Sequence, residues 1–187
     1  MGESEVWLVR HGATEWSRDG RHTSTTDLPM LPEGEEAARG LRERLEGTDF
    51  ALVLTSPLQR ARRTAELAGY PDAEPEPDLV EWSYGDYEGI TTPEIRETVP
   101  GWTVWIHPSP GGEIAEEVQT RLDRVVRRVQ QVDGNVLVVG HGHGLCGLAA
   151  RWLGLPVADG RLLELGTATV SVLGHHLEQP VVVRWNS

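Results

Sequence analysis

The segment VWLVRHG, residues 6–12, begins as an apolar run and ends abruptly in a basic pair followed by glycine. Val6 to Val9 contains two valines and a tryptophan, and it is short enough for a strand that is buried on both faces of a sheet. We therefore predict a central strand that delivers Arg10 and His11 to its carboxyl end. Gly12 then allows a close backbone approach, because it has no side chain.

The rest of the chain alternates between strand and helix patterns. Further strands are expected at Ala51–Leu54, Asn135–Val139, Ala168–Leu173 and Val181–Trp185. Helices are expected at Glu33–Leu45, at Gly112–Val132 and at about Leu145–Leu153. A further helix is expected to begin at a Ser56 cap, with Pro57 in its first turn and Gln59 completing a capping box, and to stop at Gly69. Pro71–Pro77 is interpreted as a loop, and Asp78–Pro110 as an irregular, aromatic-rich insertion over the sheet.

Strands that alternate with helices predict an α/β fold with a mostly parallel sheet. Ligands of such sheets bind at the carboxyl ends of the strands. Arg10 and His11 follow one strand, His141 follows another, and a third strand leads into the turn that launches Arg60. We therefore expect three distant segments to converge on one edge of the sheet.

Composition limits the function classes. The 187 residues suffice for one domain, and no stretch reaches the roughly 18 apolar residues that a membrane helix needs. The segment Met1–Arg10 lacks the pattern of a secretory signal, so we expect a cytoplasmic protein. A net charge of −12 disfavours nucleic acid and anionic membranes as partners. The oligomeric state is not determined by the sequence, which leaves a homodimer open.

The basic and histidine residues at the predicted edge suit one ligand chemistry. Guanidinium groups match phosphate oxygens, and a neutral imidazole is a competent nucleophile toward phosphorus. Gly142 allows close approach, and a helix that starts after Gly144 would offer unpaired N–H groups to an anion. The residue types alone leave open which of His11 and His141 is the nucleophile. They also do not single out one of the 29 acidic residues as the acid.

Four segments, in this order, resemble the motifs of the histidine phosphatase superfamily, which includes the cofactor-dependent phosphoglycerate mutases. They are LVRHGATEWS (8–17), TSPLQRARRTAELA (55–68), EWSYGDYEG (81–89) and VVGHGHGLCGLAARWLGLP (138–156). The matches extend over nearly the whole chain. The resemblance implies a three-layer, phosphoglycerate mutase-like fold in a single domain spanning residues 1–187, with a small cap insertion at about 78–110.

The resemblance also implies roles. His11 would accept the phosphoryl group, and Glu81 would be the general acid and then the base that activates water. Arg10, Arg60 and His141 would bind the phosphoryl oxygens, and Ser17, Thr23 and Gly142 would line the substrate pocket. The expected enzyme is an acid phosphatase-type phosphomonoesterase that hydrolyses a small phosphorylated metabolite through a phosphohistidine, without a metal ion or other cofactor.

Two alternatives follow from the same residues. A cofactor-dependent phosphoglycerate mutase is disfavoured by the short chain and by Ser17, which stands where mutases usually carry Asn. A non-catalytic phospho-ligand-binding module is disfavoured because the set of His11, Arg10, Arg60, Glu81 and His141 is intact. Zinc binding by His141, His143 and Cys146 lacks an evident fourth ligand. Ser24 and Ile114 also depart from the family pattern, at positions that concern substrate recognition.

Overall fold

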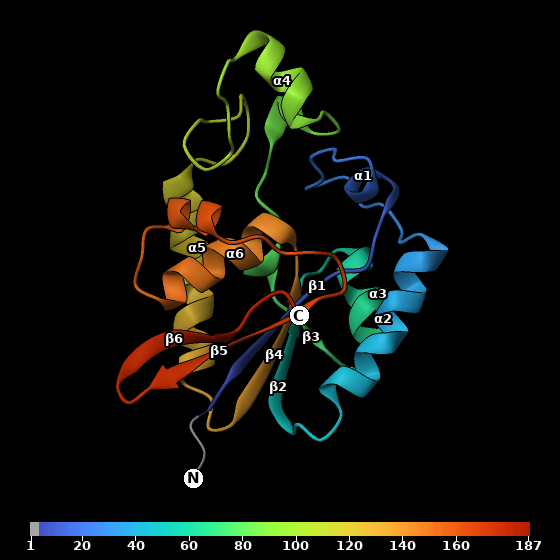
Figure 1. Ribbon diagram of the computed structural model, residues 1–187, viewed down its shortest axis with the longest axis vertical. Helices are drawn as coiled ribbons and strands as arrows, with labels where there is room; N and C mark the ends of the chain where they lie inside the picture. Colours follow the sequence, from blue (N-terminus) through green and yellow to red (C-terminus); the bar gives the residue numbers. More distant parts are fainter. Residues whose placement is uncertain (1–3) are drawn as a thin grey trace.

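A computed structural model describes residues 4–187, in which six strands form one sheet (Figure 1). Residues 1–3 lie outside the described residues. They are the start of the segment Met1–Arg10, which lacks the pattern of a secretory signal. The strands are β1 (Val6–Arg10), β2 (Phe50–Thr55), β3 (Glu74–Pro75), β4 (Asn135–Gly140), β5 (Val170–His176) and β6 (Gln179–Arg184). The helices are α1 (Glu15–Arg18), α2 (Pro32–Leu45), α3 (Gln59–Leu67), α4 (Thr92–Thr98), α5 (Ala115–Gln130) and α6 (Gly142–Trp152), with 3-10 turns at Pro77–Leu79, Gly85–Tyr87 and Val157–Leu162.

The strand order β3-β2-β4-β1-β5-β6 places β1 and β4 at the centre of the sheet. The first four strands are parallel, whereas β5 runs antiparallel to both β1 and β6. Arg10 pairs with Gly140 in the register of β1 and β4, so the two strands end side by side. This register places His11 next to His141, as the convergence argument predicts.

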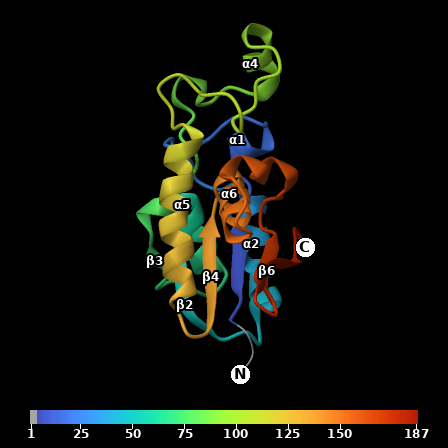
Figure 2. The ribbon, with the colours of Figure 1, turned by 90° about the vertical axis from the view of Figure 1, so that its left-hand side faces the viewer.

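The sheet is covered on both faces, which makes three layers (Figures 1 and 2). Leu8 and Val138 pack into the cluster formed with α5 and α6, whereas Val9 and Val139 pack into the cluster formed with α2 and α3. All four side chains are fully buried, and each such burial stabilises the fold by roughly 1.5–3 kcal/mol. The near-continuous apolar strands therefore reflect a mostly parallel sheet with helices on each side, the predicted fold class.

Several predicted boundaries and caps are wrong. The Ser56 cap and the Gln59 capping box do not form: α3 starts after Leu58, and the remote Asp27 carboxylate accepts from the Gln59 N–H at 2.9 Å. The helix α6 starts at Gly142 rather than near Leu145, and α5 is shorter at both ends than predicted. The expected loop at 71–77 contains the two-residue strand β3, and the sequence argument missed the one-turn helix α1. The stop at Gly69 is confirmed, with φ of +104°.

Residues 78–110 lie beyond the carboxyl ends of the parallel strands and carry α4 at the far end of the molecule (Figures 1 and 2). This segment contains more regular structure than predicted, because Thr91 and Glu94 form a capping box that starts α4. Its Trp82, Tyr84 and Trp102 are buried and join the core shared with α5 and α6. Across residues 4–187, no helix is both long and apolar enough to cross a membrane.

Candidate active site

The predicted residues at the ends of β1, β2 and β4 meet at one place. The Ser56 N–H donates to the carbonyl of Val139, and the His11 N–H donates to that of Gly140, at 2.9 and 3.0 Å. The rings of His11 and His141 are consequently stacked edge to face, with centroids 5.1 Å apart. The two imidazoles therefore belong to one site.

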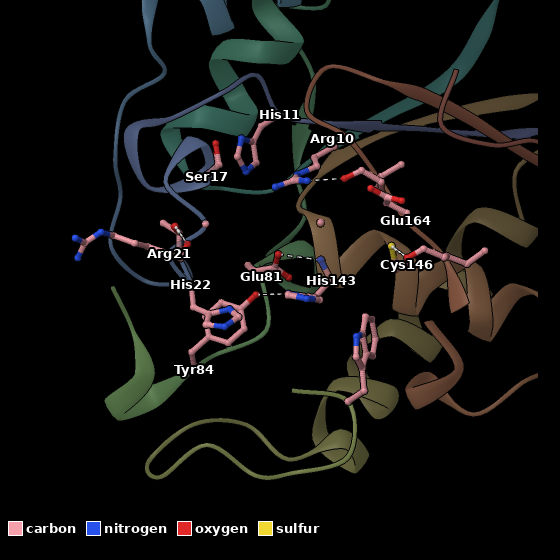
Figure 3. A pocket seen from close by; sticks show the side chains of 16 residues that line it. Arg10, His11, Ser17, Arg21, His22, Glu81, Tyr84, His143, Cys146 and Glu164 are labelled. Carbon is pink, nitrogen blue, oxygen red and sulfur yellow. Dashed lines mark hydrogen bonds between the residues drawn. The ribbon is translucent and has the colours of Figure 1, made fainter. Parts of the chain in front are cut away.

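His11 is held with one ring nitrogen free. Its Nδ1 lies 2.8 Å from the carbonyl oxygen of Gly12, which can only accept, so Nδ1 carries the proton of the neutral ring. Burial lowers the pKa of His11 well below 6.5, and the charges of Arg10 and Arg60 lower it further. The ring is therefore neutral near pH 7, with the lone pair on Nε2, and Figure 3 shows it pointing into a pocket.

His141 lies deeper and is also neutral. Burial lowers its pKa well below 6.5, and the neighbouring His11 and Arg60 act in the same direction. Its Nε2 lies 2.7 Å from the Ser56 hydroxyl oxygen. Its Nδ1 is buried without a hydrogen-bond partner, as expected for a group that binds a ligand atom.

The two arginines are tied to carbonyl groups by the ends of their side chains. Arg10 donates from Nη1 to the carbonyl of Leu165 at 2.5 Å. The fully buried Arg60 donates from Nη1 to Thr26 and from Nη2 to Ser24, at 3.1 and 3.0 Å. In both arginines Nε is buried and has no partner. Each guanidinium is thus fixed while keeping one inner donor unused.

Glu81 accepts from the first turn of α6. Its Oε2 accepts from the His143 N–H at 3.0 Å, and its Oε1 accepts from the Gly144 and Trp82 N–H groups at 2.7 and 2.9 Å. The prediction that these helix N–H groups are unpaired is therefore wrong. They hold a carboxylate instead, which the positive end of the helix dipole favours.

A cavity of about 300 Å³ opens between these groups (Figure 3). Arg10 and His11 lie on one side, and Glu81 and His143 face them. The predicted pocket residues Ser17, Thr23 and Gly142 line it as well. Arg60 and His141 are buried and are not among the residues that line this cavity, although the ring of His141 lies 5.1 Å from that of His11.

The structure adds residues that the sequence argument did not assign to the pocket. His22, Tyr84 and Trp105 also line the cavity, and the Tyr84 hydroxyl lies 2.6 Å from Nδ1 of His143. No spacing signal identifies His22 or Trp105 in the sequence. Tyr84 stands inside the segment EWSYGDYEG, of which only Glu81 received a role.

Glu88 from the same segment also shapes the site. Its carboxylate accepts from the backbone N–H groups of Ser24 and Thr26, at 2.8 and 2.9 Å, and from the Ser24 hydroxyl. The carbonyls of these two residues in turn accept from Arg60. Glu88 therefore orders the loop that orients Arg60.

Cys146 lines the cavity but is not prepared for reaction. Burial raises the pKa of its thiol to about 12, which disfavours the reactive thiolate. Across residues 4–187, no three His, Cys, Asp or Glu side chains are grouped as metal ligands would be. The zinc interpretation of His141, His143 and Cys146 thus finds no support in their placement.

A mostly parallel sheet with helices on both faces, and with two imidazoles and two guanidinium groups gathered at the strand ends, defines an α/β protein with a cationic site at the edge of its sheet. The family model of the histidine phosphatase superfamily (branch 1) matches residues 6–187. The chain belongs to this superfamily.

Several proteins similar to this chain carry phosphatase names. The chain is 40% identical over 183 residues to an acid phosphatase of Mycobacterium tuberculosis, covering 94% of this chain and 90% of that protein. It is 35% identical to sedoheptulose 1,7-bisphosphatase of Saccharomyces cerevisiae, covering 80% and 68% of the two chains. A solved structure of an open reading frame product from M. tuberculosis superposes with a TM-score of 0.94 at 36% identity, covering 98% and 97%. Proteins named probable phosphoglycerate mutase, from Salmonella, match at 28% identity over 97% of the chain and 89% of their own length.

Proposed function

We propose that this protein is a phosphomonoesterase that hydrolyses a small phosphorylated metabolite through a phosphohistidine at His11, without a metal ion. The observation that carries the proposal is the pair of neutral, buried imidazoles beside two guanidinium groups whose Nε atoms have no partner. A cavity of about 300 Å³ suits a phosphoryl group with a small leaving group. The phosphatase names of the relatives support the same reaction class.

In the first step, Nε2 of His11 attacks phosphorus and the ester P–O bond breaks. Arg10, Arg60 and His141 donate hydrogen bonds to the phosphoryl oxygens and stabilise their charge. Glu81 gives its proton to the leaving oxygen, which departs as an alcohol. The Oε1 atom of Glu81 already accepts two N–H groups, so Oε2, which accepts one, is the oxygen with room for that proton.

In the second step, Glu81 is a carboxylate and takes a proton from water. The hydroxide attacks phosphorus, the P–N bond to His11 breaks, and inorganic phosphate leaves. The imidazole lone pair and the protonated Glu81 are thereby restored. Because burial and the arginines lower the pKa of His11, the unliganded nucleophile stays neutral in mildly acidic solution, which supports an acid phosphatase type.

The test is hydrolysis of an aryl phosphate in the presence of a chelator. We expect activity to persist, His11→Ala to lower turnover by roughly 10³ or more, and Arg60→Ala to lower it by about 10²–10³. Enzyme quenched with alkali or detergent should carry a phosphoryl group that is stable in base and released in acid, as expected for the P–N bond of a phosphohistidine. Near-normal turnover of His11→Ala would refute the nucleophile assignment, and loss of activity in chelator would refute independence from metal.

The mutase-named relatives define the second candidate. A mutase would interconvert the two phosphoglycerates in a reaction that depends on a bisphosphorylated primer, and its phosphoenzyme would hydrolyse slowly. A binding module would instead retain phosphate or vanadate without turnover of any phosphoester. We expect rapid release of phosphate and no primer dependence.

A further inference from the structure

An ion pair between the buried Arg121 and the partly buried Glu113 lies next to the segment that carries Glu81. Arg121 on α5 and Glu113, just before that helix, form two parallel hydrogen bonds of 2.8 and 3.0 Å. Arg121 is 6% exposed, so its charge is almost fully removed from water. Sequence reasoning gave neither residue a role, and neither one lines the cavity.

The remaining hydrogen bonds of this pair go to residues on both sides of Glu81. Before it, Arg121 donates from Nη1 to the carbonyls of Asp78 and Val80, at 2.8 and 2.9 Å. After it, the Glu113 carboxylate accepts from the Ser83 N–H at 2.8 Å. The pair thus holds the backbone three residues and one residue before Glu81 and two residues after it, without a hydrogen bond to the Glu81 side chain.

Stability alone does not account for a pair of this kind. A buried ion pair brings little net stability, because the cost of desolvating both charges offsets their attraction, and an apolar pair can replace it. What an apolar pair cannot supply is directional bonding to two carbonyls and one N–H group. Those three bonds constrain where the segment 80–83 places the Glu81 carboxylate, opposite His11 across the cavity.

We propose that Arg121 and Glu113 are positioning residues for Glu81, which set its alignment for proton transfer to the leaving group. This inference rests on the proposed function, in which Glu81 is the general acid. Substitution of Arg121 or Glu113 should therefore slow the first phosphoryl transfer only for substrates whose leaving oxygen needs the proton of Glu81. A dinitrophenolate is a stable anion and leaves without protonation, whereas an alkoxide must be protonated as the P–O bond breaks.

The experiment compares kcat/KM for dinitrophenyl phosphate and for glycerol phosphate in the same enzyme sample. This constant reports the steps up to the first phosphoryl transfer, and the ratio of two such constants does not depend on the folded fraction. We use the conservative variants Arg121→Lys, which keeps the charge but loses the paired bonds, and Glu113→Gln, which keeps the shape. Each should lower the ratio of alkyl to aryl activity by about 10-fold to 100-fold.

Arg124→Gln is the matched control. Arg124 lies one turn further along α5 and also bonds to the 78–83 segment, but through the Asp78 side chain and from a half-exposed position. Its loss should change the ratio by less than about twofold, because exposed ion pairs contribute little. If Arg121→Lys and Glu113→Gln lower both activities equally, or no more than Arg124→Gln does, the positioning role is refuted.

The Glu81→Gln variant separates the two proposals. It should lower the alkyl activity by about 10²–10⁴ with a much smaller effect on the aryl substrate. An equal effect on both substrates would remove Glu81 as the acid, and the proposed mechanism would fail. If Glu81→Gln behaves as expected, adding Arg121→Lys to it should leave the ratio unchanged, and a further independent loss would overturn the positioning role alone.

Discussion

Replacement of His22 by glutamine tests how the pocket responds to acid. The His22 ring packs against Tyr84 and Trp102, with centroid separations of 4.7 and 5.2 Å, and lies 6.0 Å from the ring of His143. Its Nε2 is 3.1 Å from the Thr92 hydroxyl oxygen. A glutamine amide can reach the same hydroxyl but does not titrate. The substitution therefore removes a partly buried base and keeps a polar partner.

The magnitude follows from the lowered pKa. Burial lowers the pKa of His22 from 6.5 to about 4, and His143 adds to this, while the carboxylates of Glu81 and Glu88 oppose it. Between these two pH values the unfolded chain binds a proton that the folded protein does not bind, so stability rises with pH across this window and is lost as the pH falls through it. At about 1.36 kcal/mol per pH unit, acidification from pH 6.5 to pH 5 costs at most about 2 kcal/mol through this ring.

The assay is urea unfolding of the wild type and His22→Gln at several pH values between 7 and 5. The wild type should lose about 2 kcal/mol more than the variant over this range, because only the wild type carries the partly buried imidazole whose pKa is lowered. His176→Gln, at an exposed position at the end of β5, controls for the loss of a histidine as such. Parallel curves for the wild type and His22→Gln would refute the argument.

Two further substitutions probe the phosphoryl side of the site. Ser56→Ala removes the hydroxyl bonded to Nε2 of His141; we expect a loss of about 1–3 kcal/mol in the free energy of unfolding, measured in urea, together with lower turnover. Gly142→Ala places a Cβ 3.3 Å from Cζ of Arg10; the guanidinium must shift, and kcat/KM should fall by roughly 10-fold to 100-fold with little change in thermal unfolding. Wild-type kinetics in Gly142→Ala would show that the position of Arg10 is not critical.

The layers of the fold could be predicted because the strands carry an unambiguous signal. Residues 6–9 and 135–139 are apolar at almost every position, and this is needed only where both faces of a strand are covered. The start of α3 could not be predicted, because its first N–H is capped by Asp27 from a loop more than 30 residues away. Ser56, the local candidate for that cap, forms its shortest hydrogen bond with His141 instead. Local capping rules fail here because a tertiary contact takes their place.

The convergence of Arg10, His11 and His141 could be predicted because it depends only on parallel strands ending together. The partners of the site residues could not, since they come from loops whose paths the sequence does not determine. The contacts of Glu81 with the first turn of α6 join segments about 60 residues apart. The loop that binds Arg60 is ordered by Glu88, again from about 60 residues away.

The positions of the hydrogen-bond donors explain how a chain with a net negative charge can bind an anionic ligand. A protein of net charge −12 repels a phosphorylated ligand at long range, so attraction must come from groups that act at contact. Arg10 Nε, Arg60 Nε and His141 Nδ1 are three of the five buried side-chain N and O atoms that lack a partner within residues 4–187. Leaving such a group unpaired costs about 1–3 kcal/mol, which a phosphoryl oxygen at the right place would recover. Nη1 of Arg10 and both Nη atoms of Arg60 are already held by carbonyls, so these side chains need little reorganisation when the phosphoryl group is transferred. That is the condition under which electrostatic stabilisation lowers a barrier.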